Sequence, residues 1–223
     1  TVDRVDYSND TPTAVAKGPL RIARKYLAAT GNTSYGYFGG GATPSIVSTV
    51  DRIDYTNDTA VAAIRGPLSA ANRRSHAAVG NNSYGYWGGG SPGPFSTVDR
   101  VDYSNDTATA LVRGPLSQAR FSMAAAGTKS YGYFGGGYGP SPVSLVDRID
   151  YSNDTPTTPT KGPLSIVRYA PGATGNASYG YWGGGSTGPA TISSVDRVDY
   201  SSDTSTAAAK GPLTSARYGG GAT

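Results

Sequence analysis

A tandem repeat of about 48 residues runs through the chain and constrains its fold more than any other feature. The phrase VDR(V/I)DY recurs with starts 48, 48, 48 and 49 residues apart, at Val2, Val50, Val98, Val146 and Val195. Two further phrases keep this period, YGY(F/W)GGG and a basic residue followed by Gly-Pro-Leu. A fixed period of this length indicates one supersecondary unit that is copied along the chain and packs on its neighbours.

The first complete repeat predicts four short strands. Residues 2–7 alternate β-branched or aromatic residues with charges, and residues 13–16 form a second β-prone run that a Gly-Pro pair ends. Residues 26–30, which are small, and the aromatic residues 34–39 complete the set. No segment has the sustained apolar spacing of a helix. A four-stranded antiparallel unit with this period predicts an all-β fold, a β-propeller in which each repeat supplies one blade.

The order of these motifs resembles the kelch repeat. An Arg, a small-residue strand, an aromatic strand ending in Gly-Gly and a strand ending in Asp-Tyr follow one another, as in Arg24, 28–31, 35–40 and 50–55. The resemblance covers the whole chain and implies that the small-residue strand is innermost. Thr, Ala or Val stands where kelch repeats have Trp in the fourth strand, so packing between blades is expected to differ. The repeated motifs are also similar to those of repeat proteins from marine phages, especially phages of cyanobacteria. Those proteins are described as structural.

The strand count predicts one domain, residues 1–223, folded as about five four-stranded kelch-like blades. The chain holds five copies of the first, third and fourth strands but four copies of the second. We therefore expect one composite blade, closed by the C-terminal first strand (residues 220–223) and the N-terminal third and fourth strands, that lacks its second strand. The alternatives are a piece of a larger array and a gap filled by another chain. Because Thr1 is not Met, we expect a fragment or a processed chain.

Charge and composition argue against several classes of binding partner. All 15 acidic residues are Asp, three in each repeat, and the 19 basic residues also recur at fixed places, giving a net charge of +4. Charge spread evenly in this way makes no basic patch, so we expect no nucleic acid partner. Both faces of each blade are covered, so we expect the strand charges to pair within or between blades. The chain has no cysteine and no apolar run long enough to cross a membrane, so we expect neither thiolate metal sites nor membrane insertion.

Three motifs resemble functional sites, and for each we favour a structural interpretation. The run Gly39–Gly41 has no following Lys-Ser/Thr, so close backbone approach explains it better than phosphate binding. Asp6-x-Ser8-x-Asp10 lacks the Gly and Glu of a calcium loop and is typical of a turn in which Asp accepts backbone N–H groups. A single histidine builds neither a catalytic triad nor a metal cluster. We therefore expect no catalytic residue, no metal and no cofactor.

The repeats differ mainly in two connections, which follow GGG and Gly-Pro-Leu. An antiparallel four-stranded blade places both connections on one face of the ring, whereas the SNDT and GNxS turns on the other face hardly vary. Loops on a rigid scaffold commonly carry binding, and drift in unconstrained loops is the alternative. The predicted ligand-binding residues on this variable face are Lys25, Tyr26, Arg73, Arg74, His76, Phe95, Phe121, Tyr138 and Tyr169.

These features predict a binding or structural module rather than an enzyme. Five near-identical copies of each charged motif argue against one catalytic site. We expect a propeller of a phage particle or cell-surface assembly, in the virion or outside the cell, that binds a glycan or protein through the variable face. The alternative is an architectural scaffold, natural or designed, without a ligand. We expect a monomer, with an oligomer that completes the missing strand as the alternative.

Overall fold

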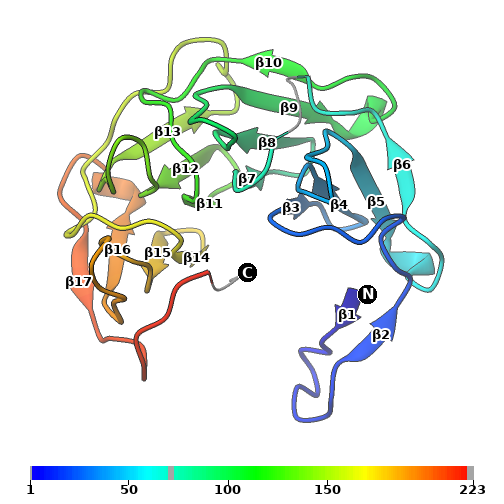
Figure 1. The fold of residues 1–223 in the computed structure, drawn as a ribbon, viewed down its shortest axis with the longest axis horizontal. Helices are drawn as coiled ribbons and strands as arrows, with labels where there is room; N and C mark the ends of the chain where they lie inside the picture. Colours follow the sequence, from blue (N-terminus) through cyan, green and yellow to red (C-terminus); the bar gives the residue numbers. More distant parts are fainter. Residues whose placement is uncertain (1, 70–72, 220–223) are drawn as a thin grey trace.

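The computed structural model describes residues 2–69 and 73–219 and shows an all-β protein. Strands make up 39% of the chain and helical turns 4%, and the strands form five antiparallel sheets of two to four strands. The sheets follow one another along an arc, with the N-terminal hairpin on one side of an opening and the C-terminal sheet on the other (Figure 1). No helix in these two ranges is long and apolar enough to cross a membrane.

Four sheets share one strand order, in which each strand pairs with its neighbours along the chain. Their first strands are β3 (Ala28–Gly31), β7 (Ala77–Gly80), β11 (Ala124–Gly127) and β14 (Gly172–Gly175). The second strands are β4 (Tyr35–Gly39), β8 (Tyr84–Gly88), β12 (Tyr131–Gly135) and β15 (Tyr179–Gly183). The third strands are β5 (Val50–Asp54), β9 (Val98–Asp102), β13 (Val146–Asp150) and β16 (Val195–Asp199). The fourth strands are β6 (Ala63–Arg65), β10 (Leu111–Arg113) and β17 (Ala208–Lys210).

The remaining elements are the N-terminal hairpin and three short helical turns. The hairpin consists of β1 (Val2–Arg4) and β2 (Val15–Lys17). The 3₁₀ turns follow three of the third strands, as η1 (Tyr55–Asn57), η2 (Tyr103–Asn105) and η3 (Tyr200–Ser202). Figure 1 shows β3, β7, β11 and β14 nearest the middle of the arc, with the fourth strands on its outer side.

The predicted strand order is confirmed in three sheets and is wrong in one detail of a fourth. The sheet β11-β12-β13 has no fourth strand, and only one bridge joins Asp147 to Thr160. Pro159 occupies the position of Leu111 in the preceding sheet, and proline has no N–H to donate to a ladder. The first strand also begins later than residue 26, because Tyr26 has a left-handed backbone with φ of 59°.

The expected composite blade lies only partly within the described residues. Its C-terminal strand, residues 220–223, falls outside them. Within residues 2–69 and 73–219, the N-terminal sheet contains only β1 and β2, and neither pairs with a strand of the C-terminal sheet. The architecture that the structure supports is therefore an arc of five antiparallel sheets.

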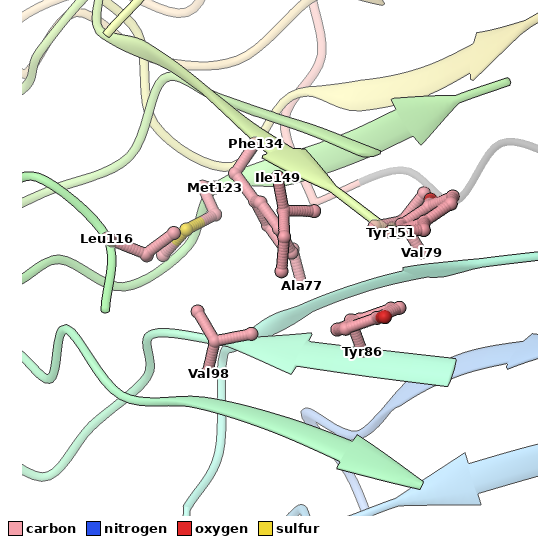
Figure 2. Close-up of a cluster of buried hydrophobic side chains, with 9 residues drawn as sticks. All are labelled: Ala77, Val79, Tyr86, Val98, Leu116, Met123, Phe134, Ile149 and Tyr151. Atoms are coloured by element: carbon pink, nitrogen blue, oxygen red, sulfur yellow. The ribbon is translucent and has the colours of Figure 1, made fainter. Parts of the chain in front are cut away.

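The hydrophobic core lies between successive sheets rather than inside any one of them. Figure 2 shows one such cluster, in which Val79 and Tyr86 come from one sheet and Phe134 and Ile149 from the next. Aromatic residues of second strands reach across to the preceding sheet. The Nε1 atom of Trp87 donates to the carbonyl oxygen of Ala28 at 3.1 Å, and the Trp87 ring is completely buried. Each sheet therefore depends on its neighbours to cover its faces.

The GGG run, whose first glycine is the last residue of the second strand, permits close contact between sheets. A Cβ atom on Gly39 would lie 2.6 Å from Trp87 Nε1, so only glycine leaves room for the indole. Gly41 has φ of 99°, and its N–H donates to the carbonyl oxygen of Arg73 at 2.8 Å in the next connection. These contacts confirm the structural interpretation of the GGG motif.

In the repeats that begin at Val50, Val98, Val146 and Val195, the three aspartates have three different roles. The first accepts from a buried arginine in its own sheet. Arg120 Nη1 lies 2.8 Å from Asp147 Oδ2, and Arg120 also donates to the carbonyl oxygens of Phe134 and Gly136 at 3.0 and 2.9 Å. Both charged side chains are fully buried, so the pair is satisfied without water. The equivalent pairs are Arg24 with Asp51, Arg73 with Asp99 and Arg168 with Asp196.

The second aspartate caps the turn after the third strand. Asp54 Oδ1 accepts from the backbone N–H of Thr56 at 2.9 Å and from the Thr56 hydroxyl at 2.7 Å. Asp6 makes the same two bonds to Ser8. These bonds hold the pKa of both carboxyls below the usual range of aspartate, since they favour the charged form. The predicted Asp turn is therefore confirmed.

The third aspartate joins one sheet to the next. Asp106 accepts from the Tyr37 hydroxyl at 2.8 Å and from Arg52 Nη1 at 2.8 Å, and both donors belong to the preceding sheet. Burial raises the pKa of the Tyr37 hydroxyl, as does the hydrogen bond to the Asp106 carboxylate. The hydroxyl therefore remains a donor. The expectation that the strand charges pair within or between blades is confirmed, since pairs occur within one sheet and between two sheets.

We expect the buried arginine of each sheet to be essential for stability. Replacement of Arg120 by Met should lower the free energy of unfolding by about 3–5 kcal/mol, because it leaves the Asp147 carboxylate buried without its cation. Urea unfolding measures the change. Arg21→Met removes a charge from an exposed side chain and should cost less than about 0.5 kcal/mol. Equal losses in the two variants would contradict the role of Arg120.

Candidate functional site

The two variable connections of each repeat are held together by a short backbone ladder. The residue three positions before each first strand pairs with the residue that follows GGG. In each pair, the N–H of one residue donates to the carbonyl oxygen of the other at 2.8 to 3.1 Å. The four pairs are Lys25 with Ala42, Arg74 with Ser91, Phe121 with Tyr138 and Tyr169 with Ser186. The two connections therefore lie on the same face, as predicted.

A left-handed residue follows each of these positions and links one repeat to the next. Tyr26, Ser75, Ser122 and Ala170 have φ values of 59°, 56°, 52° and 51°. The N–H of Ser75 donates to the Tyr26 carbonyl oxygen at 2.9 Å, and that of Ser122 donates to the Ser75 carbonyl oxygen at 2.7 Å. This backbone conformation is uncommon for residues other than glycine and persists only where the surroundings fix it. The backbone of the face is thus the same in each repeat while its side chains differ.

Six of the predicted residues form two groups on this face. The aromatic group consists of Phe121, Tyr138 and Tyr169, with ring centroids 5.5 Å apart between Phe121 and Tyr138 and 5.3 Å apart between Tyr138 and Tyr169. All three rings are partly exposed. The Tyr138 ring stands edge-on to Tyr169 at 87°, which is a favoured arrangement for two aromatic rings.

The cationic group consists of Lys25, Tyr26 and Arg74. The Lys25 Nζ and Arg74 Cζ atoms lie 5.4 and 5.9 Å from the centroid of the Tyr26 ring, one cation from its own repeat and one from the next. The Tyr26 side chain remains 55% exposed. Cations over an exposed tyrosine face are weakly attracted to it, so this group keeps donors available to a ligand.

The structure places Arg73 and His76, which were predicted on the variable face, inside the fold. Arg73 is completely buried, forms an ion pair with Asp99 and donates to the carbonyl oxygens of Gly89 and Thr97, both at 2.9 Å. His76 is 5% exposed. Neither side chain is therefore available to a ligand on the surface.

Phe95, the remaining predicted residue, is half-buried. Its N–H donates to the Gly90 carbonyl oxygen at 3.0 Å, and its own carbonyl oxygen accepts from the Arg120 N–H at 3.0 Å. Its ring makes no ring contact with either group in the described part of the chain. Seven of the nine predicted residues thus keep part of their side chain accessible on this face.

A one-residue insertion explains why Arg73 and His76 were wrongly predicted to lie on the variable face. The connection after Leu68 is one residue longer than the one after Leu20. With that residue allowed for, Arg73 occupies the position of the buried Arg120, and His76 occupies that of Met123. If the repeats are aligned on the arginine of this connection, such as Arg120, instead of on Gly-Pro-Leu, both residues are identified as internal.

A cavity of about 870 Å³ lies on the opposite face, among the turns between first and second strands. Thr128, Lys129, Tyr179, Asp199 and Tyr200 are among the residues that line it. Asp199 is already bonded to Ser201, which holds its pKa below the usual range, and burial raises the pKa of Tyr200. Lys129 was not among the predicted residues, because these turns hardly vary; the change from GNxS to GTKS is the signal that marks it.

The described residues, 2–69 and 73–219, contain no group of three or more His, Cys, Asp or Glu side chains that could hold a metal ion. A scan against protein-family models finds no match for the chain, and a search of curated proteins finds no similar sequence. The geometry of the face is therefore the basis for a functional proposal.

The buried histidine should make stability depend on pH. Burial lowers the pKa of His76 to about 3, and the nearby Arg73 guanidinium acts in the same direction. Below about pH 6.5 the unfolded chain binds a proton that the folded chain does not, so the free energy of unfolding falls as pH falls, by about 1.4 kcal/mol per unit. Urea unfolding at pH 7 and pH 5 should show a loss of about 2 kcal/mol from this residue.

The variant His76→Met supplies the control, because Met123 occupies the equivalent position. It keeps the aspartates unchanged and should lose about 2 kcal/mol less between the two pH values than the unchanged protein. The same pH dependence in both proteins would mean that His76 is protonated in the folded state.

Proposed function

We propose that this chain is a kelch-like β-propeller of about five blades that acts as a non-enzymatic recognition module. The fold proposal is supported by the shared strand order of four sheets and by the position of their small-residue strands nearest the middle of the arc (Figure 1). It is also supported by the hydrophobic clusters between successive sheets. Each sheet would then be one blade, and the N-terminal hairpin would be the outer part of another.

The observation that carries the recognition proposal is the contrast between constant backbone and variable side chains. The ladder and the left-handed residue recur in four repeats, with the same hydrogen bonds and with φ values between 51° and 59°. The side chains at the first ladder position are Lys25, Arg74, Phe121 and Tyr169. A structural role of this position would require only its backbone hydrogen bonds. The diversity of the side chains therefore favours a role in binding.

The aromatic group favours a glycan as the ligand. Phe121, Tyr138 and Tyr169 provide adjacent apolar ring faces together with two hydroxyl groups that donate and accept hydrogen bonds. Sugars carry apolar C–H faces and hydroxyl groups, which such a surface complements. Weak sites on several repeats would add avidity on a multivalent glycan. The similarity to repeat proteins of marine phages supports a place in a phage particle or cell-surface assembly.

Two placements support the non-enzymatic assignment. The histidine, which would be the usual acid–base group near neutral pH, is buried and bonded to the Gly39 carbonyl oxygen. The first aspartate of each third strand, as in Asp147 and Asp196, is fully buried in an ion pair with arginine and is not available to a substrate. The exposed face thus offers aromatic and cationic groups, which bind rather than react.

A glycan array with the purified chain tests the proposal. The chain should bind a restricted set of glycans, and the double variant Phe121→Lys, Tyr138→Ser should lose at least about tenfold in affinity. Truncation of an aromatic hot-spot residue costs about 2 kcal/mol or more, and about 1.4 kcal/mol corresponds to tenfold. The variant should fold, since Lys25 and Ser91 occupy the same two positions in other repeats. A control, Val112→Lys with Leu111→Ser, makes matched changes on an exposed outer strand and should bind normally.

Two other results would contradict the proposed site, and a third would overturn the glycan assignment. Equal loss in the control would place binding elsewhere. Binding that survives when all loops after GGG copy ATPSIVS would exclude a role of Tyr138, because Phe121 and Tyr169 lie in the other connection and stay unchanged. Absence of binding by every protein would favour a protein ligand or an architectural scaffold without a ligand, and a search with protein partners would separate these two.

A further inference from the structure

Successive sheets meet at one repeated contact, an aspartate-binding pocket. In each complete copy the pocket consists of a second-strand tyrosine, a third-strand arginine, and the Lys or Arg and the glycine that begin the basic-Gly-Pro-Leu phrase. It receives the third aspartate of the next repeat. Asp154 accepts from Tyr86 at 2.9 Å and from Arg100 at 2.7 Å, and the Gly114 N–H donates to the Asp154 carbonyl oxygen at 2.8 Å. Asp106 and Asp203 occupy equivalent pockets.

The glycine of this pocket is required by the contact. A Cβ atom on Gly66, Gly114 or Gly162 would lie 1.7 to 1.8 Å from a carbonyl oxygen of the next repeat. Gly211 stands at the same position in the C-terminal sheet, where it is exposed and an added Cβ would meet nothing within 4 Å. The chain therefore keeps a glycine at a site where the described structure presents no neighbour.

The other three residues of the pocket are also present on the C-terminal sheet. No carboxylate of the described residues occupies this copy of the pocket. Its side chains are Tyr181, Arg197 and Lys210. The Arg197 guanidinium lies 4.3 Å from the centroid of the Tyr179 ring, as Arg100 and Arg148 lie 4.4 Å from Tyr84 and Tyr131, so it already has the placement seen in the occupied pockets. Lys210 is exposed, whereas its counterpart Lys161 lies 3.3 Å from Asp203.

The N-terminal hairpin carries the missing counterpart. Asp10 is the third aspartate of the first repeat, and it is exposed, whereas Asp106, Asp154 and Asp203 are buried at 6–7% exposure. The first aspartate, Asp3, is exposed as well. Its expected partner is Arg217, the counterpart of Arg120, whose side chain is bonded to Thr214 and Ser215 of its own connection. Both ends of the arc thus present complementary halves of contacts that are complete inside it.

We propose that Asp10 docks into the pocket of Tyr181, Arg197, Lys210 and Gly211 of its own chain, so that the N-terminal hairpin closes the arc. The two ends border the same opening in Figure 1, which favours docking within one chain. Tethering also gives the hairpin a high effective concentration at the pocket. Two cations facing one carboxylate make the contact complementary in charge, and Asp3 then meets Arg217 as a second ion pair of the kind seen between Asp147 and Arg120.

Hydrogen exchange at single amides tests this docking. In the unchanged chain the Gly211 N–H should exchange slowly, like the Gly66 N–H. Gly66 donates to the Asp106 carbonyl oxygen, and Gly211 would donate to that of Asp10 in the docked state. Asp10→Lys should accelerate exchange at Gly211 by about tenfold or more while leaving Gly66 unchanged, which also shows that the rest of the chain is folded. Asp6→Lys makes the same charge change in the same hairpin, at a residue bonded within its own turn, and should leave Gly211 protected.

Two outcomes would overturn the proposal. Fast exchange at Gly211 in the unchanged chain, with no effect of Asp10→Lys, would show that the pocket stays empty. Protection of Gly211 that rises with protein concentration, together with a larger mass by light scattering, would show that the hairpin of a second copy is the occupant. Protection that is independent of concentration in a monomer is the expected result.

Discussion

The contact between one buried aspartate and the preceding sheet holds this fold together. Each sheet has at most four strands of three to five residues, which is too little to form a core alone. Asp106, Asp154 and Asp203 bring together segments more than 50 residues apart, and each accepts from a tyrosine and an arginine of the neighbouring repeat. A carboxylate out of water is costly unless its acceptors are used, so these contacts fix how one sheet sits on the next.

The aspartate contacts also explain how the chain can vary its loops. Buried ion pairs within sheets, capped turns and pockets between sheets use residues that every repeat keeps, on the strands and on the face with the constant turns. The opposite face then needs only the backbone ladder and the left-handed residue. Lys25, Arg74, Phe121 and Tyr169 share one backbone position and differ in chemistry. The proposed recognition function uses this freedom, and the proposed closure by Asp10 extends the constant contact to the two ends.

The period, the strands and the pairing of charges could be predicted from the sequence, because each depends on short patterns that recur many times. Asp turns such as Asp54 with Thr56 follow from local hydrogen bonding. Other features depend on single departures from the pattern. Pro159 stands where the fourth strand of its sheet would form. One inserted residue in the connection after Leu68 shifts the alignment, so that Arg73 and His76 occupy buried positions. The left-handed backbone of Tyr26 arises from contacts between repeats, which local propensity does not encode.

A double-mutant cycle on one contact between sheets tests the central claim most directly. Arg148→Gln and Asp203→Asn each remove one partner of a contact whose atoms lie 2.7 Å apart. If this contact holds the two sheets together, urea unfolding should give a coupling energy of about 1 kcal/mol or more between the two changes. Changes that add within about 0.3–0.5 kcal/mol would contradict it, because they would show that the sheets are held in place without the aspartate.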